Sequence, residues 1–464
     1  SNNRGRNDDQ QQQQQQQPQQ TQQAQAKFHA TYYSSIGSIL HQHGDDDTKD
    51  HNGDPSNNDD DSFFESVIIV IHGSARNADD YLCMGLSLQP TTSHLSTSNS
   101  NNNNNDITNS MNAGGGRGRV LVVAPKFPSV NDDDVYPDDP TILRWDELPP
   151  NGDKSKTHTW RWGADAVNNT TTSSSKSSST PEDVIRSSGI SSYDVIDQLI
   201  EYIVDTYKTI KRVAVIGHSA GGQVVQRWAL LSSSHVWDLA TATTTKPSIV
   251  AIPANPRSYC YLDGRRMIPV PAKYSADDDK DERNIRKTFV AETRWKFDYP
   301  IPADVSKCPT YNHWQWGLDD QTSDNELPCP YKDHALNITG GSTEQMARRY
   351  AGRNVVYLTG SEDVEYLDDH CETMNFQGFN RHARAHRFWE SIQNYFHDLV
   401  DHGDNTVILK HEIHTVEGSP HDHTLMFQSA VSLNTIFGNT PSPVWDDHVD
   451  GSGIKEEGMT TAVV

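Results

Sequence analysis

The stretch "RVAVIGHSAGGQVVQRWALL" (212–231) passes from an apolar run to an amphipathic one across a short glycine-rich turn. The run before the turn predicts a buried strand over 212–219, and the residues after it predict a helix over 221–231. Ser219 lies between two glycines at this junction. It is either a nucleophile on a strained strand-to-helix turn or a small residue in a structural turn. The strand before it and the helix after it favour the nucleophile.

The same alternation extends in both directions along the chain. Apolar strands that alternate with helices are typical of a parallel sheet covered by helices on both faces. The sequence therefore predicts one α/β domain over 63–440. The other expected strands cover 66–73, 120–127, 248–256, 353–360 and 406–416, and the other expected helices cover 78–88, 191–207, 381–400 and a segment around 424–437.

Low-complexity segments surround and interrupt this domain. Residues 1–62 are polar and repetitive, so they bury too little apolar area to offset their ordering entropy, and we expect them to be disordered. We expect 91–119 and 168–180 to be loop insertions within the domain, because the entropy of closing a loop grows slowly with its length. Residues 441–464 are expected to form a flexible tail.

Charge and hydropathy exclude several classes of partner. The 464 residues carry a formal net charge of −24, which argues against nucleic acid because phosphate binding needs a basic surface. The longest apolar run, "SVIIVI", has the length of a strand, so we expect no stable insertion into a membrane. The acidic runs lack the spacing of a calcium-binding loop and are interpreted as solvated loops.

Cysteine usage indicates few disulfides. Five cysteines are too few for a disulfide scaffold, and the odd number leaves at least one thiol without an intramolecular partner. Cys83 lies in a helical pattern and is expected to be a buried thiol. One or two disulfides are expected among the cysteines of the later part of the chain, which are Cys260, Cys308, Cys329 and Cys371.

Two features favour a secreted or extracellular protein. The chain begins "SNNRGRN", without Met and without an apolar leader, which we interpret as a mature or truncated form. Sequons that permit N-glycosylation occur at Asn168, Asn169 and Asn337.

A general base is expected in "HEIHTVEGSPHDH", because ligands bind beyond the carboxyl ends of parallel strands. His421 follows the strand in a loop and is the preferred base, with His423 as the alternative. His411 and His414 lie within the strand pattern, on opposite faces. A zinc site built from these histidines is the competing interpretation, but "HEIH" lacks the spacing of a zinc-binding helix.

An acid that orients the base is expected after the preceding strand, in "VVYLTGSEDVEYLDD". Asp363 is preferred because it follows the strand end and its "GSE" turn most closely. A carboxylate of a solvated loop is the alternative interpretation of this residue. The other acids of the segment are Glu362, Glu365, Asp368 and Asp369.

An oxyanion hole is expected at the end of the first strand, in "VIIVIHGSARNADDY". The backbone N–H of Ser74 or Ala75 is placed to join that of Ala220 in stabilising a tetrahedral intermediate. The ring of His72 is interpreted either as part of this hole or as a brace for its loop.

Six stretches carry a resemblance to a known superfamily: "HGSARNADDY", "GHSAGGQVVQRWA", "PANPRSYCYLDGRR", "YNHWQWGLDD", "CETMNFQGFNRHARAHRFW" and "GSPHDHTLMFQS". Over 63–440 the chain resembles serine hydrolases of the α/β-hydrolase superfamily, in a poorly characterised group related to secreted esterases. The resemblance implies the α/β-hydrolase fold and the chain order nucleophile, acid, base. It places these roles on Ser219, Asp363 and His421, with oxyanion donors at Ser74 and Ala220.

Two features of the chain bear on what this resemblance implies. Pro420 precedes His421 where a glycine is expected, which leaves His421 and His423 open as the base. Residues 257–345 are expected to form a loop-rich cap, joined by "WRW" at 160–162. Aromatic residues of the cap either line an acyl or aryl site or serve only in packing. They are Tyr259, Tyr261, Trp295, Phe297, Tyr299, Tyr311, Trp314 and Trp316.

The function expected from the sequence is hydrolysis of carboxylic esters through an acyl-enzyme intermediate, with no metal or organic cofactor. A peptidase or an acyltransferase would use the same residues. A catalytically silent binding protein is the alternative from another class, and retention of the serine, the acid and the histidine in order argues against it.

Overall fold

A seven-stranded sheet forms the centre of the computed structural model, with the strand order β1-β3-β2-β6-β7-β10-β11. Neighbouring strands are parallel except for the edge pair β1 and β3, which is antiparallel. The strands are β1 (Thr31–Ser34), β2 (Phe64–Ile71), β3 (Arg119–Lys126), β6 (Arg212–His218), β7 (Ser248–Ala254), β10 (Asn354–Gly360) and β11 (His411–Val416). The structure describes residues 30–35, 64–89, 119–130, 132, 142–145, 159–168, 186–232, 237, 247–269, 297–319, 329–367, 370–401 and 407–438.

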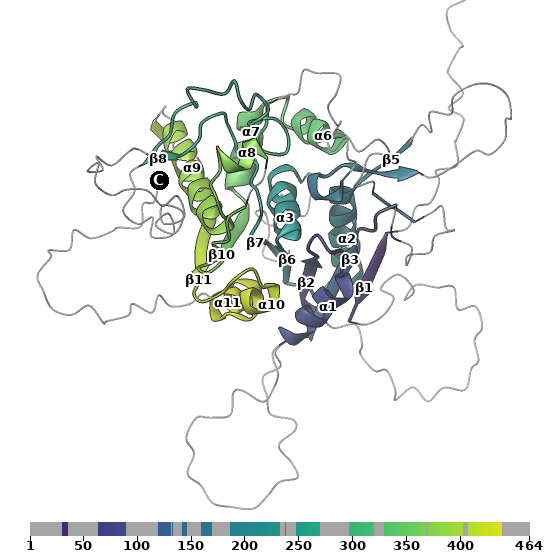
Figure 1. The fold of residues 1–464 in the computed structure, drawn as a ribbon. Coiled ribbons are helices and arrows are strands. Elements are labelled where there is room, and N and C mark those ends of the chain that lie inside the picture. The colour runs from purple at the N-terminus through teal and green to yellow at the C-terminus, as the bar shows by residue number, and fades with distance from the viewer. Residues whose placement is uncertain are drawn as a thin grey trace, which may run out of the picture.

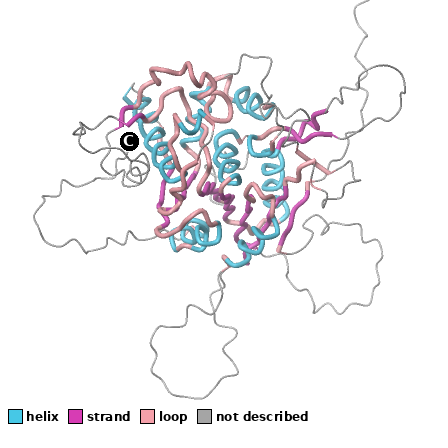
Figure 2. The backbone as a smooth tube through the Cα atoms, in the orientation of Figure 1, coloured by secondary structure: helices cyan, strands magenta, loops and turns pink. Residues whose placement is uncertain are grey.

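Helices cover both faces of the sheet because the central strands are apolar on both sides. In β2, Ile69 and Ile71 pack into one hydrophobic cluster, and Ile68 and Val70 pack into the other. The first face carries α2 (Ser192–Thr206), α3 (Ala220–Leu231), α6 (Pro330–Ile338), α7 (Thr343–Ala351) and α9 (Arg381–Asp401). The second carries α1 (Ala78–Ser87), α10 (His423–Gln428) and α11 (Ala430–Phe437), which lie together below the sheet in Figure 1. Figure 2 shows the strands between these two layers of helices.

Smaller elements lie around this core. They are the 3₁₀ turn η2 (Trp160–Trp162), the hairpin of β4 (Asp165–Asn168) and β5 (Arg186–Ser191), the pair β8 (Ile268–Pro269) and β9 (Phe297–Asp298), and the short helix α8 (Cys371–Met374). Among the described helices, none combines the length and the apolar character that crossing a bilayer requires.

The structure differs from the sequence-based expectation at β1 and in the last helical segment, and it adds α6 and α7 where a loop-rich segment was expected up to residue 345. Strand β1 lies within 1–62, which we expected to be disordered, because the β-prone "TYYS" pairs with the free edge of β3. The helix expected around 424–437 is two helices, since Ser429 has an extended ψ of 150° and its side chain accepts a hydrogen bond from the N–H of Ser432. The insertions at 91–118 and 169–180 and the tail at 441–464 lie outside the described residues.

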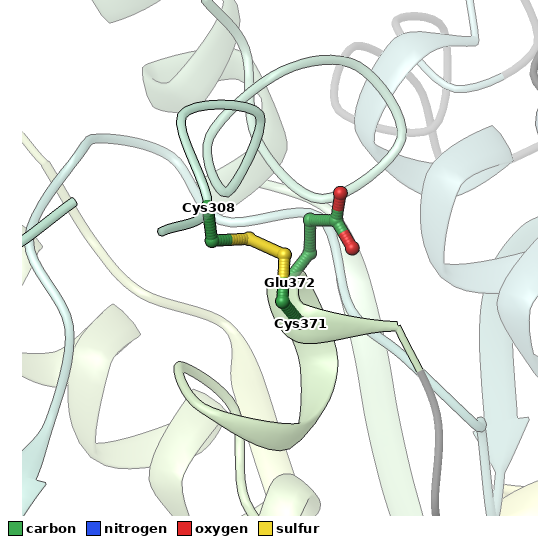
Figure 3. Close-up of side chains that lie close together, drawn as sticks. All are labelled: Cys308, Cys371 and Glu372. Carbon is green, nitrogen blue, oxygen red and sulfur yellow. A yellow bond between two sulfur atoms is a disulfide. The ribbon is translucent and has the colours of Figure 1, made fainter. Parts of the chain in front are cut away.

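One disulfide, between Cys308 and Cys371, joins the loop segment 297–319 to α8 (Figure 3). Its Cα atoms are 5.9 Å apart and its half-cystines are separated by 63 positions in the sequence. Cys260 and Cys329 are buried free thiols. The prediction of a buried thiol at Cys83 is wrong, because its side chain is exposed on the outer surface of α1.

Arg227 holds the described parts of 257–345 against the domain, and Arg266 links two loops within that segment. Arg227 of α3 is fully buried, and it donates hydrogen bonds to the carbonyl of Gln315 (3.0 Å) and to Oγ of Ser258 (2.9 Å). Arg266, also fully buried, donates to Oδ1 of Asn312 (2.8 Å). Together with α6 and α7, these loops belong to the same core, so a separate cap is not confirmed.

The aromatic residues of this segment are largely packed inside. Tyr259 and Tyr261 are buried, and the ring of Tyr259 stacks on Phe388 of α9 with 4.4 Å between centroids. Tyr311 and Trp314 are also buried, whereas Trp295 lies outside the described residues.

Candidate active site

Ser219 occupies a strained turn between β6 and α3. Its φ of 58° and ψ of −114° place a non-glycine residue in a region that side chains rarely adopt. A Cβ at Gly217 would lie 2.4 Å from the carbonyl oxygen of Gly221, and one at Gly221 would lie 2.2 Å from that of Ile71. Both neighbours must therefore be glycine for the helix to approach the strands. This is the geometry of a nucleophile elbow, with the serine partly exposed.

Asp363 and His421 are brought together from the loops after β10 and β11. The distance from Nδ1 of His421 to Oδ2 of Asp363 is 2.7 Å. The Asp363 side chain is fully buried, and that of His421 is 30% exposed. Because a carboxylate only accepts hydrogen bonds, Nδ1 carries the proton, and Nε2 is left to accept one.

The two loops are locked to each other by their backbones. The N–H of Glu362 donates to the carbonyl of Ser419 (3.1 Å), and the N–H of Gly418 donates to Oγ of Ser361 (2.8 Å). A Cβ at Gly360 would lie 2.2 Å from the carbonyl oxygen of Ser419, so the loops touch at a glycine. Pro420 is accommodated within this contact, and His421 still reaches Asp363.

His421 lies close to the turn of Ser219, because its ring contacts the ring of His218, the residue before Ser219. The ring centroids of His218 and His421 are 4.4 Å apart. No hydrogen bond joins the Ser219 and His421 side chains within the described chain. Such bonds are often long without a ligand and shorten in the complex.

The loop after β2 is shaped by His72. Burial lowers the pKa of His72 to about 4, so its ring is neutral at ordinary pH. Nε2 accepts a hydrogen bond from the N–H of Phe127 (3.1 Å), and Nδ1 therefore donates to the carbonyl of Gly73 (2.8 Å). In a trans peptide the next N–H points the opposite way, so His72 fixes the direction of the Ser74 N–H. The ring thus braces the loop.

Arg76 holds the same loop from its other end. Its φ of 58° is a second strained backbone position, and its N–H donates to the carbonyl of Gly73 (3.1 Å). The guanidinium binds both carboxylate oxygens of Asp132, at 2.9 and 2.7 Å. This bidentate pair fixes the turn that contains Ser74.

These features identify the fold from the structure itself. A strained turn with Ser219 follows β6, Asp363 follows β10 and His421 follows β11, at the carboxyl edge of a parallel sheet with helices on both faces. The chain has the α/β-hydrolase fold. No protein-family model matches the sequence, and no curated protein matches it either.

Solved α/β-hydrolase-fold structures that are similar to the chain share little sequence with it. The poly(3-hydroxybutyrate) depolymerase LpqC from Bordetella parapertussis is 16% identical, with 80% of this chain and 83% of that chain covered and a TM-score of 0.39. Poly(aspartic acid) hydrolase-1 from Sphingomonas sp. KT-1 is 17% identical, with coverage of 81% and 88% and a TM-score of 0.41. The siderophore hydrolase EstA from Aspergillus nidulans is 12% identical, with coverage of 81% and 82% and a TM-score of 0.29.

Asn255 lies at the candidate site, and the sequence analysis missed it. It is buried after β7 with a φ of 45°, and its Oδ1 accepts a hydrogen bond from the N–H of Gly360 (2.8 Å). Its Nδ2 lies 3.5 Å from Nε2 of His218. Asn255 therefore connects the acid turn to the elbow. The signal in the sequence was an asparagine, which tolerates positive φ, at a predicted strand end in "PANP".

Arg381 is a second missed residue. It lies in the first turn of α9, and its Nη1 donates to Oδ1 of Asp363 at 3.2 Å. Asp363 thus accepts from the imidazole on one oxygen and from a guanidinium on the other. Because the carboxylate is fully buried, the cation offsets part of the desolvation that its charge suffers.

The other candidate bases have different partners. His423 begins α10, and its ring stacks on Tyr81 with 4.4 Å between centroids. His411 is buried in β11, where its ring contacts the hydroxyl of Tyr357 and the carbonyl of Tyr350. His414 pairs with Glu412 at 3.1 Å. None of these three is hydrogen-bonded to Asp363 in the part of the chain that is described.

The other candidate acids of this segment are Glu362, Glu365, Asp368 and Asp369. Glu362 and Glu365 are exposed, and Asp368 and Asp369 fall outside the described residues.

One group of titratable side chains in the described segments is close enough together to share a metal ion. It consists of Cys308, Cys371 and Glu372 (Figure 3). The two sulfurs form the disulfide and offer no thiolate, and the Glu372 carboxylate accepts a hydrogen bond from Thr310. These residues do not fit a metal, and the histidines after β11 form no such group among the described residues.

Proposed function

We propose that this protein is a serine hydrolase that cleaves carboxylic esters, with Ser219 as nucleophile, His421 as general base and Asp363 as the acid that orients it. The single observation that carries this proposal is the 2.7 Å contact between Nδ1 of His421 and Oδ2 of Asp363 beside the strained serine. Ester specificity follows from the resemblance of the sequence to secreted esterases, and the elbow geometry supports acyl transfer in general.

Acylation begins at Ser219. Oγ attacks the carbonyl carbon of the ester while Nε2 of His421 takes the hydroxyl proton. Asp363 keeps the proton of Nδ1 in place and stabilises the imidazolium that forms. The tetrahedral intermediate collapses when the bond from carbon to the leaving oxygen breaks, and Nε2 returns its proton to that oxygen. An alcohol leaves, and Ser219 is acylated.

Deacylation repeats these steps with water. His421 takes a proton from water as its oxygen attacks the acyl carbon, and then returns the proton to Oγ of Ser219 when the carboxylic acid leaves. Atoms and charges balance without a metal or an organic cofactor.

The oxyanion is stabilised by the backbone N–H groups of Ser74 and Ala220. Ala220 begins α3, where the first N–H groups have no acceptor within the helix. The direction of the Ser74 N–H is set by His72 and Arg76. Each such donor is worth about 3 kcal/mol of barrier.

A fluorophosphonate probe tests this proposal directly. We expect stoichiometric labelling at Ser219 in the wild type and none in Ser219→Ala, with the modified peptide identified by mass spectrometry. A p-nitrophenyl ester series then gives the acyl preference. Folded protein that takes no label and cleaves no ester contradicts the proposal and supports a silent binding protein.

Two histidine variants separate the candidate bases. We expect His421→Gln to abolish labelling and turnover, and His423→Gln to retain most of both. Of these two histidines, only His421 is hydrogen-bonded to Asp363. The opposite pattern would move the base to His423.

A further inference from the structure

Asn337 lies on the outer surface of α6, one residue before the helix ends. Its neighbours Asp333 and His334, one turn earlier, are exposed as well, whereas Tyr331 and Ala335 on the inner face are buried. The side chain of Asn337 therefore points away from the core, on the exposed face of α6; the helix itself is labelled in Figure 1.

The chain around Asn337 leaves open space. Gly340 and Gly341 follow with φ of 64° and 77°, and their N–H groups bond back to the carbonyls of Asn337 and Leu336. A Cβ added at Gly340 or Gly341 would meet no atom within 4 Å. A bulky group on Asn337 would thus find no obstacle from this turn.

Asn337, Ile338 and Thr339 form a sequon, in which the hydroxyl two residues after the asparagine is required. Ile338 is 51% exposed, one of the few large apolar side chains on the described surface. A sugar attached at Asn337 would cover part of this apolar surface.

A second, independent observation places the chain where sugars are attached. The disulfide between Cys308 and Cys371 forms and persists in an oxidising compartment such as the lumen of the endoplasmic reticulum. N-linked glycosylation is a modification of secreted proteins. The exposed sequon and the disulfide are therefore both consistent with passage through the endoplasmic reticulum.

We propose that Asn337 is an acceptor for an N-linked glycan. The donor is an oligosaccharide joined to a lipid through a pyrophosphate. Nδ2 of Asn337 forms a bond to C1 of the first N-acetylglucosamine, the bond from C1 to the phosphate oxygen breaks, Nδ2 loses one proton, and the lipid pyrophosphate leaves. The inference is independent of the proposed esterase activity.

The test is expression of the full chain, led into the endoplasmic reticulum of a eukaryotic host by a signal sequence. The secreted protein is treated with peptide N-glycosidase, and the peptide that contains residue 337 is identified by mass spectrometry. We expect a glycan on this peptide, which the enzyme removes with conversion of Asn337 to Asp.

Matched variants separate the sequon from the fold. Asn337→Gln and Thr339→Ala are expected to lose the glycan at this site, and Thr339→Ser is expected to keep it. The Oγ1 of Thr339 also donates to the carbonyl of Leu336 (2.9 Å), so Thr339→Ser further controls for the loss of this bond. An unmodified 337 peptide from secreted wild-type protein with its disulfide formed would overturn the proposal, even if Asn168 or Asn169 were glycosylated.

Discussion

Replacing the strained serine by glycine is expected to make the protein more stable while it abolishes catalysis. The φ of 58° and ψ of −114° at Ser219 are unfavourable for any residue with a Cβ. Strain of this kind costs about 1–3 kcal/mol. Glycine relieves it but adds about 0.4–1 kcal/mol of backbone entropy to the unfolded chain. The net expectation is a gain of about 1 kcal/mol in the free energy of unfolding.

Ser219→Ala is the matched comparison, because it also removes Oγ but keeps Cβ and therefore the strain. Urea denaturation, followed by tryptophan fluorescence, measures the unfolding free energies of the wild type and the two variants. We expect Ser219→Gly to be more stable than Ser219→Ala by about 1 kcal/mol, with both inactive. Equal stability of the two variants would refute the strain at this position and remove the physical reason for the elbow.

Four further outcomes are expected. Asp363→Asn should lower kcat on a p-nitrophenyl ester by about 10⁴-fold, because the amide favours the wrong imidazole tautomer, and a loss below tenfold would reject this role. Burial lowers the pKa of His411 to about 4, from 6.5 when unfolded, so its contribution is fully present above pH 6.5 and is lost as pH falls toward 4. The wild type should lose about 3 kcal/mol more unfolding free energy than His411→Gln between pH 7 and pH 4, as measured by urea denaturation at each pH. The same dependence of unfolding free energy on pH in both proteins would contradict this. Replacing Cys308 and Cys371 by serine should lower the unfolding free energy by up to about 4 kcal/mol, since the disulfide closes a long loop, whereas an unchanged urea midpoint would show no such constraint. Gly221→Ala should prevent soluble expression, because its Cβ would lie 2.2 Å from the carbonyl oxygen of Ile71, and a soluble variant with a wild-type melting temperature would count against that contact.

The sheet and the elbow were predictable because their signals are local. Each central strand is a continuous apolar run, and the strand expected over 212–219 and the helix expected over 221–231 match β6 and α3 within a residue. The position of Ser219 follows from that boundary alone. The break at Ser429 was missed because its two helices share one apolar pattern, and β1 was missed because its four residues lie in a long polar segment.

Contacts between distant segments were harder to predict. Arg381 lies 18 positions after Asp363, in a helix where Arg384 binds loop carbonyls instead, and nothing in its own sequence marks it as the partner of an acid. Asn255 acts on Gly360, which is 105 positions away. These residues meet at the carboxyl edge of the sheet only because β7, β10 and β11 are neighbours in the strand order. That order is a property of the folded sheet.

The buried Arg227 has a consequence for how the proposed hydrolase would meet water-insoluble substrates. Where a lid must swing aside before substrate enters, lid opening can set the rate of turnover, and a substrate surface that favours the open lid would then raise that rate abruptly. Here Arg227 binds the carbonyl of Gln315 and Oγ of Ser258 from within the core, and a hinge motion of that described wall would break these buried hydrogen bonds. Turnover should therefore rise smoothly with substrate concentration through the onset of micelles or droplets, as for an enzyme that acts on dissolved molecules.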